Sequence, residues 1–255
     1  MSKGERMRVS DFITLRRVAM RTGLTLVVGA STVCLPSSAQ SPVTISTDGN
    51  DPVRPVSSLA GELRKREGVA VTYEDPRYAK RGDMHGKPWT FVYSPEEIRG
   101  SQGPEQTIAR MLREASAAGG PVFKVLKEGS RLHIVPSEVL NDSGARARQA
   151  SILDTVIDVP PAGRDGGDLI QAICDAVQQR TGYEIGIGPS APSNNLAEYH
   201  TGEGVAHMTA RAALQHVLDK ATPVGTYVWD LYYDPADHGY GLNFVYVGFA
   251  GRADR

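Results

Sequence analysis

The sequence predicts an α+β fold made of two tandem small sandwiches, each with the order β-α-β-β-α-β-β. That order occurs twice, in residues 43–135 and again in residues 152–247. In each half an amphipathic helix ends at a glycine just before a strand, Gly68 before VAVTY and Gly182 before YEIGIG. Each half also ends with two strands in which apolar and polar residues alternate, and this pattern is typical of a hairpin with one covered face.

Residues 1–39 have the three-part pattern of an export signal. A basic stretch is followed by an apolar run from Leu24 to Ala30 and then by the small residues Ser37, Ser38 and Ala39. The apolar run is much shorter than the roughly 20 residues that span a bilayer, so a cleaved signal is favoured over a membrane anchor. We expect cleavage after Ala39 and a periplasmic or secreted chain with no membrane span.

The composition of the exported part excludes several classes of partner. Removing residues 1–39 lowers the count of Lys and Arg from 28 to 22 and that of Asp and Glu from 29 to 27, so the net charge is near −5. No block of like charge remains, and we expect no binding to nucleic acid. Cys174 is then the one cysteine left, on the apolar face of a helix, where a small buried residue is favoured over a catalytic thiol.

The first module is expected to cover residues 41–136. It begins with the strand PVTIST, and a Pro-rich turn leads into a helix from about Ser57 to Glu67 that stops at Gly68. The strands VAVTY and WTFVY follow, separated by the charged loop EDPRYAKRGDMHGKP. A second helix starts at Gly103 and Pro104, and its buried face is expected to hold Ile108, Met111, Leu112 and Ala115. A hairpin of VFKVL and RLHIV closes the module.

Residues 137–150 carry little apolar periodicity and are predicted to be a linker between the modules.

The second module is expected to cover residues 151–250. It begins with the strand ILDTVIDV, and Asp168 with Gln171 resembles a capping box at the start of a helix that Gly182 ends. After the strand YEIGIG we predict a loop, PSAPSNN, and a strand, AEYHTGEGV. Thr209 is predicted to cap the next helix, whose buried residues repeat at helical spacing. These residues are Ala213, Leu214, Val217, Leu218 and Ala221.

The closing hairpin of the second module is unusually aromatic. Eight of the chain's 17 Phe, Trp and Tyr residues fall between Tyr227 and Phe249, so a large apolar contact surface is expected there. Burial against the module's own helices is one interpretation. The other is that the hairpin ends the sheet with an open edge, to which another envelope protein or a second copy adds a strand. The predicted partner-binding residues are Tyr227, Trp229, Tyr232, Tyr233, Tyr240, Phe244 and Tyr246.

Each half resembles the secretin and TonB N-terminus (STN) domain, a small periplasmic module. Four segments carry the resemblance: LAGELRKREGVAVTYE, PEQTIARMLREAS, LIQAICDAVQQRTGYEIGIG and TARAALQHVLDKAT. The resemblance implies a compact α+β module that docks to other proteins and has neither a cofactor nor a catalytic residue. The charged loop after VAVTY is longer than the family pattern.

Two classes of function remain open from the sequence. A non-enzymatic docking protein of the bacterial envelope is the first, since no Walker sequence, nucleophile elbow or paired-cysteine zinc pattern is present. The glycines at 186 and 188 formally fit a dinucleotide fingerprint, but Pro189 and Pro192 interrupt the helix that it requires, so no cofactor is expected. The alternative is an envelope hydrolase that uses His200, Glu203 or His207. Zinc is not expected there, because a Gly-containing segment fixes no ligand geometry.

Overall fold

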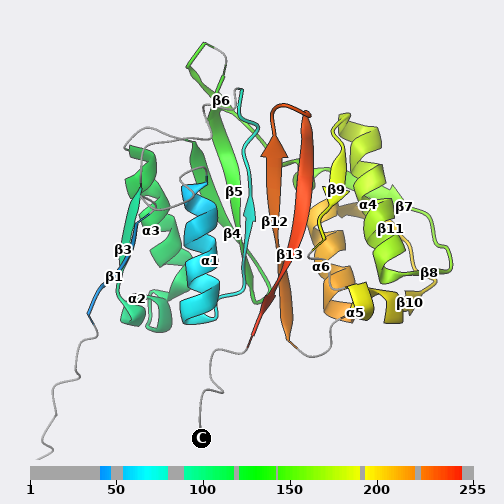
Figure 1. The fold of residues 1–255 in the computed structure, drawn as a ribbon, viewed down its shortest axis with the longest axis horizontal. Coiled ribbons are helices and arrows are strands. Elements are labelled where there is room, and N and C mark those ends of the chain that lie inside the picture. Colours follow the sequence, from blue (N-terminus) through cyan, green and yellow to red (C-terminus); the bar gives the residue numbers. More distant parts are fainter. Residues whose placement is uncertain are drawn as a thin grey trace, which may run out of the picture. The chain divides into compact units, whose positions relative to one another are not determined.

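A computed structural model describes residues 41–46, 54–79, 89–117, 121–141, 143–189, 193–221 and 225–248 (Figure 1). Residues 39–255 form one compact unit. The expected export signal, residues 1–39, lies outside the described residues, and so does most of the charged loop that follows VAVTY. Within the described part of the chain, no helix is long and apolar enough to cross a bilayer.

The first half contains three helices and six strands in the part of the chain that is described. Its strands are β1 Val43–Ser46, β2 Val71–Glu74, β3 Thr90–Tyr93, β4 Val122–Glu128, β5 Arg131–Leu140 and β6 Arg146–Arg148. Its helices are α1 Pro55–Glu67, α2 Pro95–Arg99 and α3 Gly103–Ala117.

The second half repeats this order with additional short elements. Its strands are β7 Val156–Val159, β8 Arg164–Asp165, β9 Ile185–Ile187, β10 His200–Thr201, β11 Val205–Thr209, β12 Thr226–Asp234 and β13 Gly239–Val247. Its helices are α4 Gly166–Thr181, α5 Ser193–Glu198 and α6 Ala210–Ala221, preceded by a 3-10 turn over Ile152–Asp154.

The two halves share the same pattern of strand pairing, and the predicted α+β class is confirmed. In the first half β1 pairs with β3, β4 forms a hairpin with β5, and β2 runs parallel to β5. In the second half β7 pairs with β11, β12 forms a hairpin with β13, and β9 runs parallel to β13. Apart from β6, which pairs with β5, and the short pair β8–β10, each half therefore has one two-stranded sheet and one group of three strands.

The two groups of three strands join into one sheet, with the order β4-β5-β2-β12-β13-β9 and β6 beside β5. The joint is the parallel pair β2–β12, in which Tyr73 faces Asp230 and Glu74 faces Leu231. The order of equivalent strands continues across this joint, but their directions reverse. The second half is thus turned over relative to the first, about an axis that crosses the strands.

The helices of the two halves consequently cover opposite faces of the shared sheet (Figure 1). Successive residues of a strand point to opposite faces. In β2, Tyr73 lies in the core of the first half, whereas Glu74 contacts Arg211 of α6. In β12, Asp230 contacts Arg64 of α1 although both of its neighbours lie in the core of the second half.

Each half has its own hydrophobic core, and a tyrosine side chain from the other half packs into or against each core. Tyr78, which follows β2, is buried in the second core, and Tyr232 of β12 packs against the first. The predicted core residues Leu214 and Leu218 of α6 are fully buried, as is Ile108 of α3. The helical spacing of apolar residues therefore assigned these faces correctly.

The predicted linker was wrong. Residues 137–140 continue β5, and β6 folds back to pair with β5 through Glu138–Arg148 and Leu140–Arg146. The turn between these strands depends on Asn141, whose side-chain carbonyl accepts hydrogen bonds from the backbone N–H groups of Ser143 and Ala145. A segment poor in apolar residues can form a strand at a sheet edge, because backbone hydrogen bonds hold it there.

Local signals at the helix ends gave mixed results. Gly68 and Gly182 end α1 and α4 in the left-handed conformation as predicted, with φ of 64° and 78°. Thr209 caps α6, since its hydroxyl accepts from the N–H of Ala212. The capping box predicted at Asp168 was misplaced, because Asp165 caps α4 and Asp168 lies inside it.

Two predicted segments of the second half differ in the structure. The predicted loop PSAPSNN ends in helix α5, and the predicted strand AEYHTGEGV is divided between α5, the two-residue β10 and the start of β11. In the first half, the short helix α2 was not predicted, although Ser94 and Glu97 form a complete capping box at its start.

Candidate functional site

The joint between β2 and β12 concentrates the buried charges of the described residues. Six charged side chains lie within it or beside it and are at most 8% exposed: Arg64, Glu74, Asp75, Arg131, Arg211 and Asp230. A buried charge is strongly unfavourable unless it is paired, so the partners of these groups show what the cluster does.

On the face covered by α1, arginines of the first half bind carboxylates beside the joint. Arg64 donates from Nη1 to Asp230 Oδ2 over 2.8 Å, contacts the other carboxylate oxygen through Nη2, and donates from Nε to the carbonyl of Val71 over 2.7 Å. Arg54 Nε donates to Asp75 Oδ2 over 2.7 Å, and its Nη2 donates to the carbonyl of Tyr233. Each arginine therefore binds both halves at once.

On the opposite face the same arrangement is found with the roles exchanged. Arg211 of α6 donates from Nε and Nη2 to the two carboxylate oxygens of Glu74, both over 2.9 Å. Arg211 also contacts Asp154, and Ser151 donates to Glu74. Arg131 of β5 reaches the other half as well, with Nη1 lying 2.6 Å from Asp219 Oδ1. The halves are thus held by reciprocal arginine–carboxylate pairs.

Asp75 binds the start of the loop after β2 to the second half. Its N–H donates to the carbonyl of Leu231 over 2.8 Å, and its carboxylate accepts from the N–H of Tyr233 over 2.9 Å. Burial raises the pKa of Asp75 to about 6, because the loss of solvent outweighs the pairing with Arg54 and the hydrogen bonds from Tyr73 and Tyr233.

His133 is a buried neutral residue beside the joint. Its Nδ1 lies 2.9 Å from the hydroxyl of Thr72, and its ring packs on Trp229 with 5.4 Å between centroids. Burial and the nearby cations of Arg211 and Arg131 lower its pKa to about 3. A histidine in this state is neutral near neutral pH, and its contacts link β5 to β2 and β12.

The aromatic hairpin is core for the most part, and it does not end the sheet as predicted. β12 pairs with β2 at Asp230 and Leu231, and β13 pairs with β9 over Tyr240–Leu242, so the predicted open edge is covered in these stretches of the two strands. Of the predicted binding residues, Trp229, Tyr233, Tyr240 and Phe244 are buried, and Tyr227 and Tyr232 are half-buried. Tyr246 alone of the seven is largely exposed, at 50%, and its ring packs against Tyr227.

The residues of the hydrolase alternative, His200, Glu203 and His207, are all exposed. Glu203 lies 3.4 Å from His216. His207 has a positive φ of 53°, and its N–H donates to Asp158. Within the described ranges no group of His, Cys, Asp and Glu could hold a metal ion. Cys174 is buried, as expected, and burial raises the pKa of its thiol to about 12.

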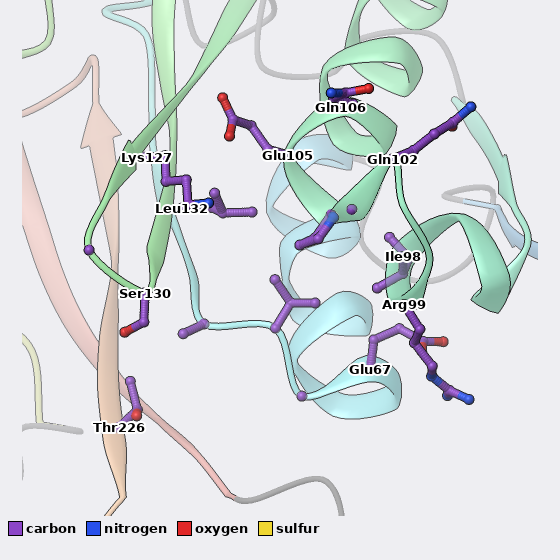
Figure 2. Close-up of a pocket in the computed structure, with 16 residues that line it drawn as sticks. Glu67, Ile98, Arg99, Gln102, Glu105, Gln106, Lys127, Ser130, Leu132 and Thr226 are labelled. Atoms are coloured by element: carbon purple, nitrogen blue, oxygen red, sulfur yellow. The ribbon is translucent and has the colours of Figure 1, made fainter.

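An open groove of about 770 Å³ lies at the end of the sheet where β5 and β12 begin (Figure 2). Its walls are the end of α1, the end of α2, the start of α3 and the β4–β5 turn, and Thr226 of the second half contributes to its rim. The lining combines apolar Ile98 and Leu132 with charged Glu105 and Lys127. Sequence reasoning did not indicate this groove, because its walls come from segments that are far apart in the chain.

The two ends of the shared sheet are open among the described residues, since β4 pairs only with β5 and β9 only with β13. The Gly129–Ser130 turn makes Glu128–Arg131 the closing pair of the β4–β5 hairpin. Backbone groups of a hairpin alternate between its partner and the outside, so the N–H and C=O of Val125 and Lys127 point away from β5.

Comparison with known proteins adds no assignment: no family model, no curated protein and no solved structure matches the chain. The resemblance of each half to the STN domain therefore remains a prediction.

Proposed function

We propose that the protein is exported to the bacterial envelope and docks there to another protein without catalysing a reaction. The open strand edge of β4 carries the proposal. It is seven residues long. Strand addition at an equivalent edge already occurs within the protein, because β12, the strand of the second half equivalent to β4, pairs with β2. A strand edge with unpaired backbone groups is a standard site for strand addition by a partner.

The use of the buried charges supports this interpretation. Glu74, Asp75 and Asp230 each have an arginine partner in a closed interface, and their role is to hold two modules together. Interfaces that bury hydrogen-bonded ion pairs of this kind select a partner by charge complementarity. The chain thus joins its two modules by the same physical means that we propose for its external partner.

The test is capture of a partner from the envelope fraction by residues 39–255 carrying an affinity tag. Val125→Pro removes an outward N–H of β4 while leaving the ladder to β5 intact, because proline is tolerated where the N–H faces solvent. Lys124→Glu reverses a charge on the same edge, and Lys220→Glu makes the same change on the exposed side of α6 as a control.

A specific partner should be retained by the wild-type protein and by Lys220→Glu and lost from both β4 variants. Retention by all four proteins would place docking elsewhere, and the groove at Glu105 and Lys127 would be the next surface to vary. Absence of any partner in every preparation would contradict the proposal.

A further inference from the structure

Within each pair of equivalent segments, the residue numbers of the two halves differ by a constant amount. Residues of α3 and β4 correspond to those of α6 and β12 at a difference of 106, since Ile108, Met111 and Phe123 match Leu214, Val217 and Trp229 in burial and in place. Residues of α1 and β2 correspond to those of α4 and β9 at a difference of 114, because Gly68 and Gly182 are the same left-handed helix stop.

This correspondence shows which residues of the first half lie where the joint has its ion pairs. Lys124 of β4 occupies the place of Asp230, and Glu105 of α3 occupies the place of Arg211. Both positions are reversed in charge relative to the joint. Lys124 is exposed and Glu105 is half-buried, in contrast to their equivalents, which are 5% and 2% exposed under the neighbouring module.

The other end of the sheet does not match this edge. Gln178 of α4 occupies the place of Arg64, and Gly188 occupies the place of Glu74. A second copy that added its β9 beside β4 would bury Lys124 and Glu105 against neutral neighbours. Burying an unpaired charge is strongly unfavourable, so head-to-tail addition of a second copy is disfavoured.

We propose that β4 docks a module of the same α/β kind from another protein, with the charges of the internal joint inverted. Its helix carries a carboxylate where α1 carries Arg64, to bind Lys124, and its strand carries a lysine or arginine where β2 carries Glu74, to bind Glu105. The backbone of its strand pairs in parallel with Val125 and Lys127, as β2 pairs with β12. This inference rests on the proposed docking function and names the partner's chemistry.

The test introduces a charge at Gln178, the position equivalent to Arg64, so that the β9 edge of one molecule can pair with the β4 edge of another. Self-association is the readout. Four versions of residues 39–255 are compared, all with Glu105→Ala so that this charge stays out of the contact. They carry Lys124 with Gln178→Glu, Lys124 with Gln178→Arg, Lys124→Asp with Gln178→Glu, and Lys124→Asp with Gln178→Arg. Both positions are exposed, and matching urea unfolding curves check that all four fold alike.

The two opposite-charge combinations should associate head to tail, with a weight-average mass in sedimentation that rises roughly twofold or more with concentration. The two like-charge combinations should remain monomeric, and high salt should weaken the association. The same behaviour in all four proteins, whether associated or monomeric, would overturn the inference. The proposed function is judged separately, because capture of a natural partner that is lost in Val125→Pro would stand even if the charge pattern failed.

Discussion

Arg211 in α6 of the second half donates to both carboxylate oxygens of Glu74 in β2 of the first, each over 2.9 Å. Glu74 is fully buried and Arg211 is 2% exposed. Together with the Arg64–Asp230 pair on the opposite face, this contact joins the two halves within one compact unit.

Removing one member of this pair should be strongly destabilising. Arg211→Met leaves the Glu74 carboxylate buried without its arginine, and we expect a loss of about 3–5 kcal/mol in the free energy of unfolding by urea. The exposed Arg180 provides the control, because Arg180→Met should change stability by less than about 0.5 kcal/mol. Adding Glu74→Gln to Arg211→Met should recover part of the loss. Equal effects of Arg211→Met and Arg180→Met would contradict the structural role of the pair.

Leu214→Ala and Leu218→Ala should each lower the free energy of unfolding by about 2–5 kcal/mol, because both side chains are fully buried on the core-facing side of α6. Lys220→Ala on the exposed side of the same helix should change the free energy of unfolding by only a few tenths of a kcal/mol. Urea unfolding followed by circular dichroism measures all three. A loss below about 1 kcal/mol for either leucine would show that this face is not packed as described.

Asp75 should make stability fall as the pH rises from about 4 to 6. Its pKa is raised to about 6 in the folded state from 3.8, so in this window the folded protein holds a proton that the unfolded chain has lost. Asp75→Asn removes this contribution. The wild-type protein should therefore lose stability relative to the variant as the pH rises through the window, in urea titrations at several pH values. A constant difference between the two proteins would show that the carboxyl titrates normally.

His133 should act in the opposite direction. Its pKa is lowered to about 3 from 6.5, so between these values the unfolded chain binds a proton that the folded protein does not, and stability rises with pH. The two slopes oppose each other between about pH 4 and 6. Nuclear magnetic resonance of the ring is the direct measurement, and an ordinary titration near 6.5 would refute the buried neutral state.

Cleaving the chain in the turn between β5 and β6 should not separate the halves. A protease site inserted between Ser143 and Gly144 lies in an exposed turn, and the cut fragments are still joined by the β2–β12 pair and its arginines. We expect the fragments to co-elute in size-exclusion chromatography and to unfold in a single transition. Elution of two separately folded fragments would restore the picture of independent domains.

The elements that could be predicted are those with a local cause. The apolar spacing of Leu214, Val217 and Leu218 predicts a buried helix face, and the glycines at 68 and 182 predict the helix ends. The repeated order of strands and helices was visible for the same reason, because each unit has its own apolar pattern. The prediction extended correctly to the fold class.

The joint could not be predicted, because pairing between β2 and β12 links residues more than 150 positions apart. The alternation of apolar and polar residues within a strand does not determine which strand pairs with it. One signal was present. Asp230 interrupts the apolar run of its strand, and Glu74 ends a strand that is buried on both faces. Charges at such places require buried partners, and the arginines that provide them were within the predicted helices.

The rate at which the buried thiol of Cys174 is modified measures how often the compact unit opens. The other cysteine, Cys34, lies before residue 39, so residues 39–255 contain one thiol. Alkylating reagents attack the thiolate, which is scarce at a pKa of about 12 and shielded in the hydrophobic core of the second half. Modification therefore has to wait until α4 separates from its neighbours, and its rate records how often the folded protein opens. The same shielding leaves no thiol on the described surface to cross-link two molecules in an oxidising compartment.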